Sequence, residues 1–207
     1  MLIPLDKIIN DFDLKIRGVL HIGAHWGEEY DAYYKQNIKN LIFFEPIRSN
    51  YEMLMDNLPE DDNIIVCNVA LGNEVGEKEM FTETANRGQS CSFLEPLGHL
   101  KSYPHIKFDR KEVVSIDKLD NISFDRSLYN MINIDVQGYE LEVFKGGMDT
   151  IRFIDIMYAE VNFNDVYKDC CKVDELDSFL GMFGFNRVLT ETKYSYLGWG
   201  DALYLKT

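Results

Sequence analysis

Short apolar runs that end in polar residues alternate along the chain with segments in which apolar side chains recur every three or four positions. Such runs predict strands buried on both faces, and the second spacing predicts amphipathic helices. The predicted strands cover 19–22, 41–44, 64–71, 131–136 and 154–162, and the predicted helices cover 5–12, 28–36, 50–58, 139–146 and 173–183. This alternation indicates a parallel sheet with helices on both faces.

The end of the chain breaks the alternation, because strands predicted over 185–190 and 202–206 are separated only by a loop over 194–200. Two strands joined so closely pair antiparallel. We therefore predict an α/β fold: a Rossmann-like, doubly wound, mostly parallel sheet with a C-terminal antiparallel hairpin. At 207 residues the chain is expected to form a single domain over 1–207, with its first helix inside 1–17.

Regular periodicity is lost between residues 84 and 111, where glycine, serine, proline and histidine accumulate. A loop this long inside a compact domain is usually functional or mobile, so we expect 84–111 to be an active-site loop region. Short strands are predicted on either side of it, over 78–82 and 113–119.

Composition narrows the class of protein. Hydrophobic residues make up 46% and charged residues 27% of the chain, which is typical of a folded protein. The net charge of −14, without a dense basic patch, argues against a nucleic-acid partner. The four cysteines have no metal-binding spacing and predict reduced thiols, and no apolar run approaches the roughly twenty residues of a membrane span. We expect a cytoplasmic protein.

The first strand leads into Gly23-Ala24-His25-Trp26-Gly27, a turn placed to floor a ligand site at the carboxyl end of the sheet. A dinucleotide needs a glycine where His25 stands, so a dinucleotide is disfavoured. Glu45 ends the second strand about twenty residues later, where a carboxylate binds ribose hydroxyls. The alternative role for Glu45 is to cap the next helix. The turn at 23–27 together with a ribose-binding Glu45 suits a nucleoside without phosphates, such as S-adenosylmethionine.

Seven short motifs, in order between 19 and 162, resemble those of the FkbM family of S-adenosylmethionine-dependent methyltransferases. They are Gly23-Ala24-His25 with Gly27-Glu28, Phe44-Glu45-Pro46, 68–72, 88–90, 115–119, 134–140 and 159–162. The resemblance implies the class I methyltransferase form of the predicted fold, with S-adenosyl-L-methionine as cofactor. The implied cofactor-binding residues are Gly23, Ala24, His25, Glu45, Pro46, Asn68, Val69, Ser90 and Asp135.

Each implied residue has an expected role. Gly23 and Ala24 would lie under the methionine part, Asn68 and Val69 beside the adenine, and the segment 89–90 over the cofactor. Two positions depart from the family, which usually has aspartate at His21 and asparagine at His25. We expect His21 to be an inert core histidine.

Methyl transfer to an alcohol requires a base near the attacking hydroxyl or a cation that lowers its pKa. Asp135 ends a central strand and is the first catalytic candidate, although it could instead cap the following helix. Glu160 and Asn162 are two apart on the next strand, so they share a face; Glu160 is the second catalytic candidate and Asn162 a substrate ligand. These three oxygen donors could hold Mg²⁺, as in catechol-type methyltransferases, or grip a polyhydroxylated substrate directly.

Trp199 and Asp201 fall in the terminal hairpin and are expected to bind substrate, by stacking on a sugar face and by bonding its hydroxyls. Trp199 could instead pack under the hairpin. His99 and His105 are either loop bases or exposed bystanders.

The expected function is S-adenosylmethionine-dependent O-methylation of a small-molecule or glycan acceptor, at a sugar hydroxyl. The alternatives are a lipid or polyketide hydroxyl, or an inactive nucleoside-binding interaction module. The sequence leaves the oligomeric state open.

Overall fold

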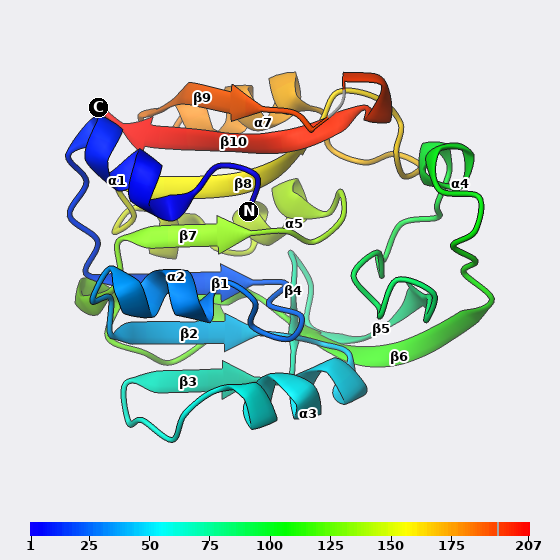
Figure 1. The fold of residues 1–207 in the computed structure, drawn as a ribbon, viewed down its shortest axis with the longest axis horizontal. Helices are drawn as coiled ribbons and strands as arrows, with labels where there is room; N and C mark the ends of the chain where they lie inside the picture. Colours follow the sequence, from blue (N-terminus) through cyan, green and yellow to red (C-terminus); the bar gives the residue numbers. More distant parts are fainter. Residues whose placement is uncertain (194) are drawn as a thin grey trace.

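A computed structural model describes residues 1–193 and 195–207, and its centre is a seven-stranded sheet of order β3-β2-β1-β7-β8-β10-β9 (Figure 1). The strands are β1 Gly18–Ile22, β2 Asn40–Phe44, β3 Ile64–Cys67, β7 Met131–Ile134, β8 Ile156–Asn162, β9 Phe185–Glu191 and β10 Trp199–Lys206. The first five are parallel, and β10 runs antiparallel to both of its neighbours. The predicted doubly wound sheet with its C-terminal hairpin is confirmed.

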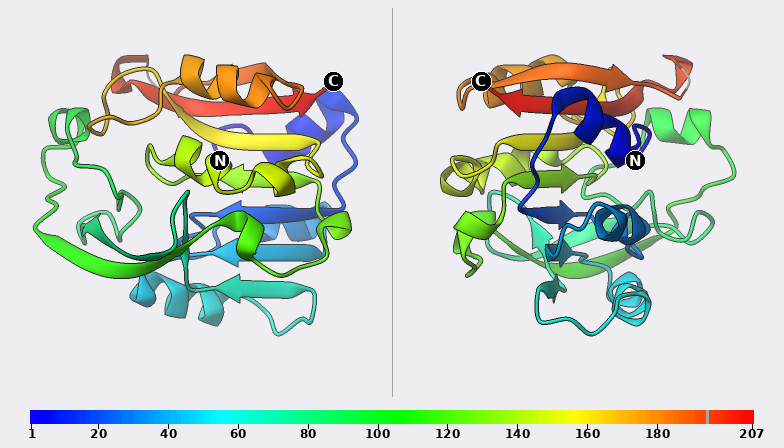
Figure 2. Two further views of the ribbon diagram at one scale, coloured as in Figure 1. Left: turned by 180° about the vertical axis from the view of Figure 1, so that it is seen from behind. Right: turned by 60° about the vertical axis from the view of Figure 1, so that its left-hand side comes forward.

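Helices cover both faces of this sheet (Figures 1 and 2). One face carries α1 Leu5–Phe12, α2 Tyr30–Lys35 and α3 Arg48–Asn57, and the other carries α5 Glu140–Lys145, α6 Met148–Ile151 and α7 Val173–Gly181. Alternate residues of one strand enter different cores, so Val19 packs with α1 and α2 while Leu20 packs on the opposite face. The helix ends differ from those predicted by only a few residues.

A second, three-stranded sheet was not predicted. It has the order β4-β6-β5 and consists of β4 Ala70–Leu71, β5 Gly76–Thr82 and β6 Arg110–Asp117. The single strand predicted over 64–71 is therefore wrong, because it divides between two sheets. The Asn68 side chain donates to the carbonyls of Glu45 and Pro46, both at 2.9 Å, and this fixes the chain where it leaves β3.

The prediction of a loop over 194–200 also needs correction, because β10 already begins at Trp199; Tyr194 itself lies outside the described residues. Trp199 and Asp201 thus belong to a strand, where they pair with Asn162 and Glu160 of β8. Gly200 does not mark a turn. A Cβ there would lie 2.3 Å from the carbonyl oxygen of the neighbouring strand, so glycine permits the close approach of two strands.

The segment 84–111 holds a short helix, α4 Gly98–Ser102, and the start of β6. The strands β1, β2 and β7 point their carboxyl ends toward the region of α4, β5 and β6 (Figure 1). Two short 3-10 helices, Leu119–Asn121 and Arg126–Leu128, lead back to β7, and a third, Ser195–Leu197, precedes β10. In the part of the chain that is described, no helix is long and apolar enough to cross a membrane.

Candidate active site

Four of the predicted site residues meet at the carboxyl edge of the sheet. Gly23, Glu45, Asn68 and Asp135 each follow directly on the last residue of a parallel strand. The backbone N–H groups of Gly23, Glu45 and Asp135 still donate to the adjacent strand, at 3.0, 3.1 and 3.0 Å. The register of the sheet therefore brings together residues that lie more than a hundred positions apart.

A cleft with two lobes opens at this edge. The first lobe is largely apolar, and Val69, Leu71, Met80, Phe93 and Tyr139 are among its walls, with Glu45 and Pro46 also lining it. The rings of Phe93 and Tyr139 meet edge to face with centroids 5.1 Å apart. Asn68 does not line this lobe; its side chain holds the backbone of 45–46 instead.

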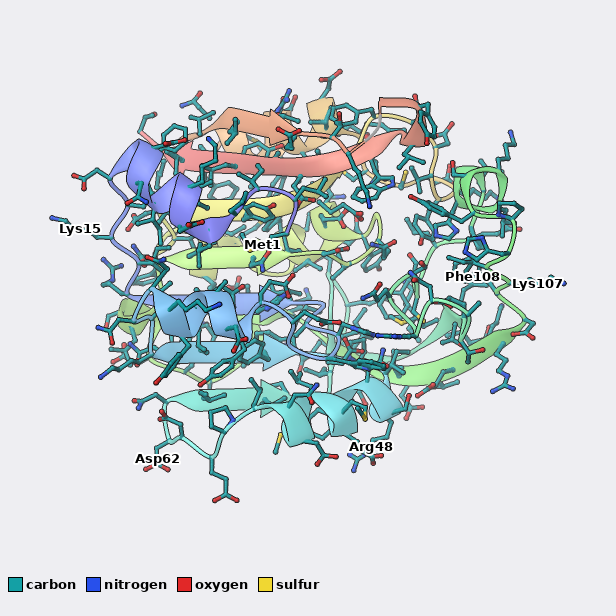
Figure 3. The ribbon with its side chains drawn as sticks, viewed as in Figure 1. Met1, Lys15, Arg48, Asp62, Lys107 and Phe108 are labelled. Carbon is teal, nitrogen blue, oxygen red and sulfur yellow. The ribbon has the colours of Figure 1, made fainter. Side chains whose placement is uncertain are left out.

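The second lobe is polar and has a volume of about 560 Å³. It shares Gly23, His25, Gln89, Asp135 and Gln137 with the first lobe, so the two form one continuous cleft. Other predicted residues on its walls are Ala24, Ser90, Glu160, Trp199 and Asp201. The amino-terminal residues lie in front of β7 and β8 beside this lobe (Figure 3), where the Leu2 N–H donates to Asp201 at 2.6 Å.

Glu45 is held from both sides and is only 5% exposed. One carboxylate oxygen accepts the N–H of His25 and the other accepts the N–H of Ile47, both at 2.9 Å. Burial raises the pKa of Glu45 to about 7, and the two backbone hydrogen bonds oppose the rise. Ile47 is the N-cap residue of α3, which has no side-chain cap, so Glu45 fixes the chain just before this helix, and its carboxylate oxygens retain lone pairs for a ligand.

Gly23 permits the tightest approach in the cleft. Its φ of 81° lies in the left-handed region, and a Cβ at this position would lie 1.9 Å from the carbonyl oxygen of Asp135. The N–H of Ala24 donates to Phe44 at 3.0 Å and fixes the next residue of the loop. Only glycine lets the loop after β1 cross so close to the loop after β7.

Three carboxylates lie in a row across the sheet. Asp201 of β10 pairs directly with Glu160 of β8. Asp135 comes directly after Ile134, which pairs with the residue before Glu160 on β8. The Gln137 side-chain amide donates to Asp135 at 2.6 Å and to Glu160 at 3.0 Å. The Tyr158 hydroxyl donates to Asp201.

The protonation of these carboxylates follows from their surroundings. Glu160 and Asp201 are buried, and burial raises the pKa of both, with the charge of Asp135 adding to the rise at Glu160. Asp135 lines the cleft and is exposed to it; desolvation raises its pKa to about 6, and the Gln137 hydrogen bond opposes the rise. Near neutral pH the site can hold a proton on Glu160 beside an ionised Asp135.

The magnesium hypothesis receives no support from this arrangement. The Gln137 amide bridges Asp135 and Glu160, and Asn162 is 1% exposed, does not line the cleft and has a side-chain nitrogen without a hydrogen-bond partner. Over residues 1–193 and 195–207, no three carboxylate, imidazole or thiol groups are placed to hold a metal ion.

A family model described as Methyltransferase FkbM domain matches residues 21–195. The chain belongs to the FkbM methyltransferase family. This confirms the resemblance drawn from the seven motifs. Among curated proteins, the 2-O-methyltransferase NoeI of Sinorhizobium fredii is 25% identical over 158 residues, which are 72% of this chain and only 65% of the length of NoeI.

Solved structures with a similar fold come from methyltransferases with different acceptors. One is Sp1610 of Streptococcus pneumoniae, assigned to tRNA (m1A22) methylation and solved with S-adenosyl-L-methionine. Its TM-score is 0.54 and its sequence identity 14%, and the match covers 100% of this chain and 73% of the Sp1610 chain. Another is the magnesium protoporphyrin IX methyltransferase ChlM of Synechocystis PCC 6803 with bound SAM, with a TM-score of 0.55 and 9% identity. That match covers 98% of this chain and 76% of the ChlM chain. The TM-scores show the class I methyltransferase fold, and identities this low leave the acceptor open.

In this FkbM methyltransferase, sequence reasoning missed several residues of the cleft. Gln137 follows Asp135 by two positions in the loop after β7, and its place in the motif 134–140 was the available signal. Glu29 lines the polar lobe, and its carboxylate lies 3.9 Å from the His21 Nε2. No sequence pattern pointed to Glu29. His21 itself is buried, and burial lowers the pKa of its ring; its nitrogens lie 3.4 Å from Tyr33 and Asn133.

The two loop histidines differ in burial. His99 lines the polar lobe and is 4% exposed, and its Nδ1 has no hydrogen-bond partner among the described residues. Its ring packs against Tyr167, whose hydroxyl lies 2.8 Å from the Gln137 side-chain oxygen. His105 is exposed.

Replacing Glu140 with glutamine should stabilise the protein at alkaline pH. Glu140 is 1% exposed, burial raises its pKa to about 7, and one of its oxygens accepts the N–H groups of Val136 and Gly138. The Glu140 carboxyl loses its proton near pH 4.5 in the unfolded chain but only near pH 7 in the folded protein. Between these pH values the free energy of unfolding therefore falls, by on the order of 3 kcal/mol in total at about pH 8.

Urea unfolding of Glu140→Gln and wild type at about pH 5 and about pH 8 checks this prediction. The variant should gain stability over wild type as the pH rises, because its amide cannot ionise. Glu142→Gln, on the same helix but half-exposed, is the matched control and should show no such trend. An equal difference at both pH values for Glu140→Gln would contradict the assignment.

Proposed function

We propose that this chain transfers the methyl group of S-adenosylmethionine to a hydroxyl group of a sugar. The observation that carries the proposal is one continuous cleft in which an apolar lobe lined by Glu45 joins a polar lobe that contains Asp135 and Glu160. Membership of the FkbM family supports methyl transfer, and the name of NoeI supports transfer to oxygen.

The residues of the cleft fit the proposed cofactor. The apolar lobe, with Val69, Phe93 and Tyr139, suits a planar base, and the free lone pairs of Glu45 suit the two hydroxyls of a ribose. The carboxylates of the polar lobe suit a ligand with a positive charge. S-adenosylmethionine supplies a methyl group already activated on a sulfonium centre.

The chain's own task is then to place and deprotonate the acceptor hydroxyl. Asp135 has an accessible carboxylate at the junction of the lobes and is the proposed base. Its pKa of about 6 leaves it ionised at neutral pH yet basic enough to take a proton from a hydroxyl in the transition state. Gln137 holds this carboxylate in place, and Glu160, protonated, can donate a hydrogen bond to a second acceptor oxygen.

The sugar acceptor is argued from the walls of the polar lobe. Trp199 offers an apolar ring face, and Glu160, Asp201 and His99 offer hydrogen-bonding groups around it. This mixture suits a ligand with hydroxyls on its rim and apolar carbon faces. The acidic walls disfavour a phosphate-rich acceptor such as RNA.

Incubation with methyl-labelled S-adenosylmethionine and a panel of free and nucleotide-linked sugars tests the proposal. Label should enter at least one sugar, with an equal amount of S-adenosylhomocysteine formed. Label entering only a lipid or polyketide alcohol would overturn the sugar assignment. Tight cofactor binding without transfer to any hydroxyl would favour an inactive nucleoside-binding module.

Replacing Glu45 with glutamine should weaken S-adenosylmethionine binding by about 10- to 100-fold, because a charge-assisted acceptor of ribose hydroxyls is lost. The glutamine NH₂ would also face one of the two backbone N–H groups that now donate to the carboxylate. Calorimetric titration of the cofactor measures the change. Glu52→Gln, on exposed α3 surface, is the matched control, and an unchanged affinity in Glu45→Gln would count against the ribose role.

A further inference from the structure

The segment 83–92, here called the strap, crosses the junction of the two lobes. Its Gly88 and Gln89 line the apolar lobe, and Gln89 and Ser90 line the polar lobe. The buried carboxylate of Glu83 accepts the backbone N–H groups of Asn86, Gly88 and Ser90 at 2.6, 3.0 and 3.3 Å. These internal hydrogen bonds give the strap a shape of its own, so it can be positioned as a unit.

One side of the strap is joined to the β7–β8 half of the cleft. The Ser92 hydroxyl donates to the Gln137 carbonyl at 2.8 Å, and the Tyr167 hydroxyl donates to the Ser90 carbonyl at 2.9 Å. The two hydroxyls do not ionise near neutral pH, and the two backbone carbonyls carry no titratable proton. This attachment is therefore insensitive to pH.

The other side of the strap is joined to the loop after β1 through His25. The His25 ring has Nδ1 2.7 Å from a Glu28 carboxylate oxygen and Nε2 2.8 Å from the carbonyl oxygen of Arg87 in the strap. The ring stacks on Trp26 at a centroid distance of 4.8 Å, and the Arg87 guanidinium lies 5.4 Å from the Trp26 ring. Gln89 adds a longer contact of 3.4 Å to Glu28.

The chemistry of these partners requires a protonated ring. A carbonyl oxygen and an ionised carboxylate can only accept hydrogen bonds, whereas a neutral imidazole has a single N–H. Both contacts are hydrogen bonds only when both nitrogens carry protons. The charged groups that face the ring are Glu28 and Glu45 on the loops below it and the Arg87 side chain on the strap.

The surroundings favour this charged form. Partial burial disfavours the protonated ring, but the hydrogen bonds to Glu28 and to the Arg87 carbonyl outweigh it and raise the pKa of His25. Partial burial likewise opposes ionisation of Glu28, and the hydrogen bond from His25 outweighs it, lowering the pKa of Glu28 to about 2. The contact is thus present below the pKa of His25 and is lost as the pH rises through it.

We propose that His25 is a positioning residue whose protonated ring holds the strap across the cofactor cleft, so that the bound nucleoside exchanges faster once the ring loses its proton. The proton passes to solvent, and one of the two hydrogen bonds breaks. This inference rests on the proposed function, since it assigns the nucleoside to the same cleft.

The dissociation rate of S-adenosylhomocysteine, followed by stopped flow from about pH 6 to about pH 9, tests the inference. In the wild type the rate should rise about tenfold, as expected for loss of a charge-assisted hydrogen bond. His25→Asn should show fast dissociation at all pH values and no such rise. Glu28→Gln, which keeps the ring, should move the midpoint to lower pH, and an NMR titration of the His25 ring should give the same midpoint as the rate in each protein.

His105→Asn is the matched control, because it removes an exposed histidine that lines the polar lobe but lies outside the strap and outside the loop after β1, and it should leave the pH profile unchanged. Ionisation of Glu45, whose pKa is about 7, strengthens its acceptance of ribose hydroxyls and slows dissociation as the pH rises, so it cannot imitate the expected rise. Absence of S-adenosylhomocysteine binding at any pH would overturn the proposed function. Binding with the same pH profile in wild type and His25→Asn would overturn the role of His25 alone.

Discussion

Replacing Gly23 with alanine is expected to lower the free energy of unfolding by about 2–5 kcal/mol, from left-handed backbone strain and a forced displacement. Gly23 has a φ of 81°, and the added Cβ would lie 1.9 Å from the Asp135 carbonyl oxygen. That oxygen belongs to the backbone, so it cannot move aside as a flexible side chain could. Urea unfolding measures the loss.

The same substitution should remove cofactor binding from whatever protein remains folded. The displaced backbone carries Asp135, and the loop after β1 also supplies the His25 N–H that holds Glu45. Gly181→Ala is the matched control, because Gly181 lies in α7 and a Cβ there meets nothing within 4 Å. It should be neutral or stabilise by up to about 1 kcal/mol. Equal unfolding midpoints for the two variants would contradict the close approach at Gly23.

Asp135→Asn should abolish most of the methyl transfer while leaving the cleft intact. Loss of a general base typically costs about 10²- to 10⁴-fold in rate. The variant keeps an oxygen that can accept from Gln137, so the loop after β7 should keep its conformation. S-adenosylhomocysteine affinity, measured by calorimetry, should therefore change only a few-fold.

The pH profile separates this role from a structural one. Because the pKa of Asp135 is raised to about 6, the wild-type rate should rise as the pH passes through about 6 and then level off. Asp135→Asn should lack that step. Asp155→Asn, at the opposite end of β8 and paired with Arg17, is the control and should behave as wild type. Full turnover by Asp135→Asn would exclude it as the base.

The strand ends could be predicted because one rule places them. The strands predicted to end at Ile22 and Phe44 end there, and the strand predicted over 131–136 ends at Ile134, directly before Asp135. Parallel strands bring their carboxyl ends to one edge. Gly23, Glu45 and Asp135 follow from that rule without knowledge of any long-range contact. The predicted sheet and its hairpin were confirmed for the same reason.

What was not predicted depends on contacts between segments distant in sequence. Strand β4 belongs to the second sheet, and between β3 and β4 the Asn68 amide binds the carbonyls of 45–46, a bond that no local pattern encodes. Likewise the contact of His25 with Arg87 joins residues 62 positions apart. Gly200 shows the opposite error, since a glycine that permits close strand packing was interpreted as a loop residue.

The central claim is that the cleft moves a methyl group from S-adenosylmethionine to a sugar oxygen. Its most direct test is a turnover with S-adenosylmethionine carrying ¹³C in the methyl group, in the presence of the sugar panel, followed by carbon NMR of the product. The expected result is a labelled methyl carbon bonded to a sugar oxygen, absent with Asp135→Asn. A labelled methyl on nitrogen or carbon, or no labelled product while the cofactor binds, would contradict the claim.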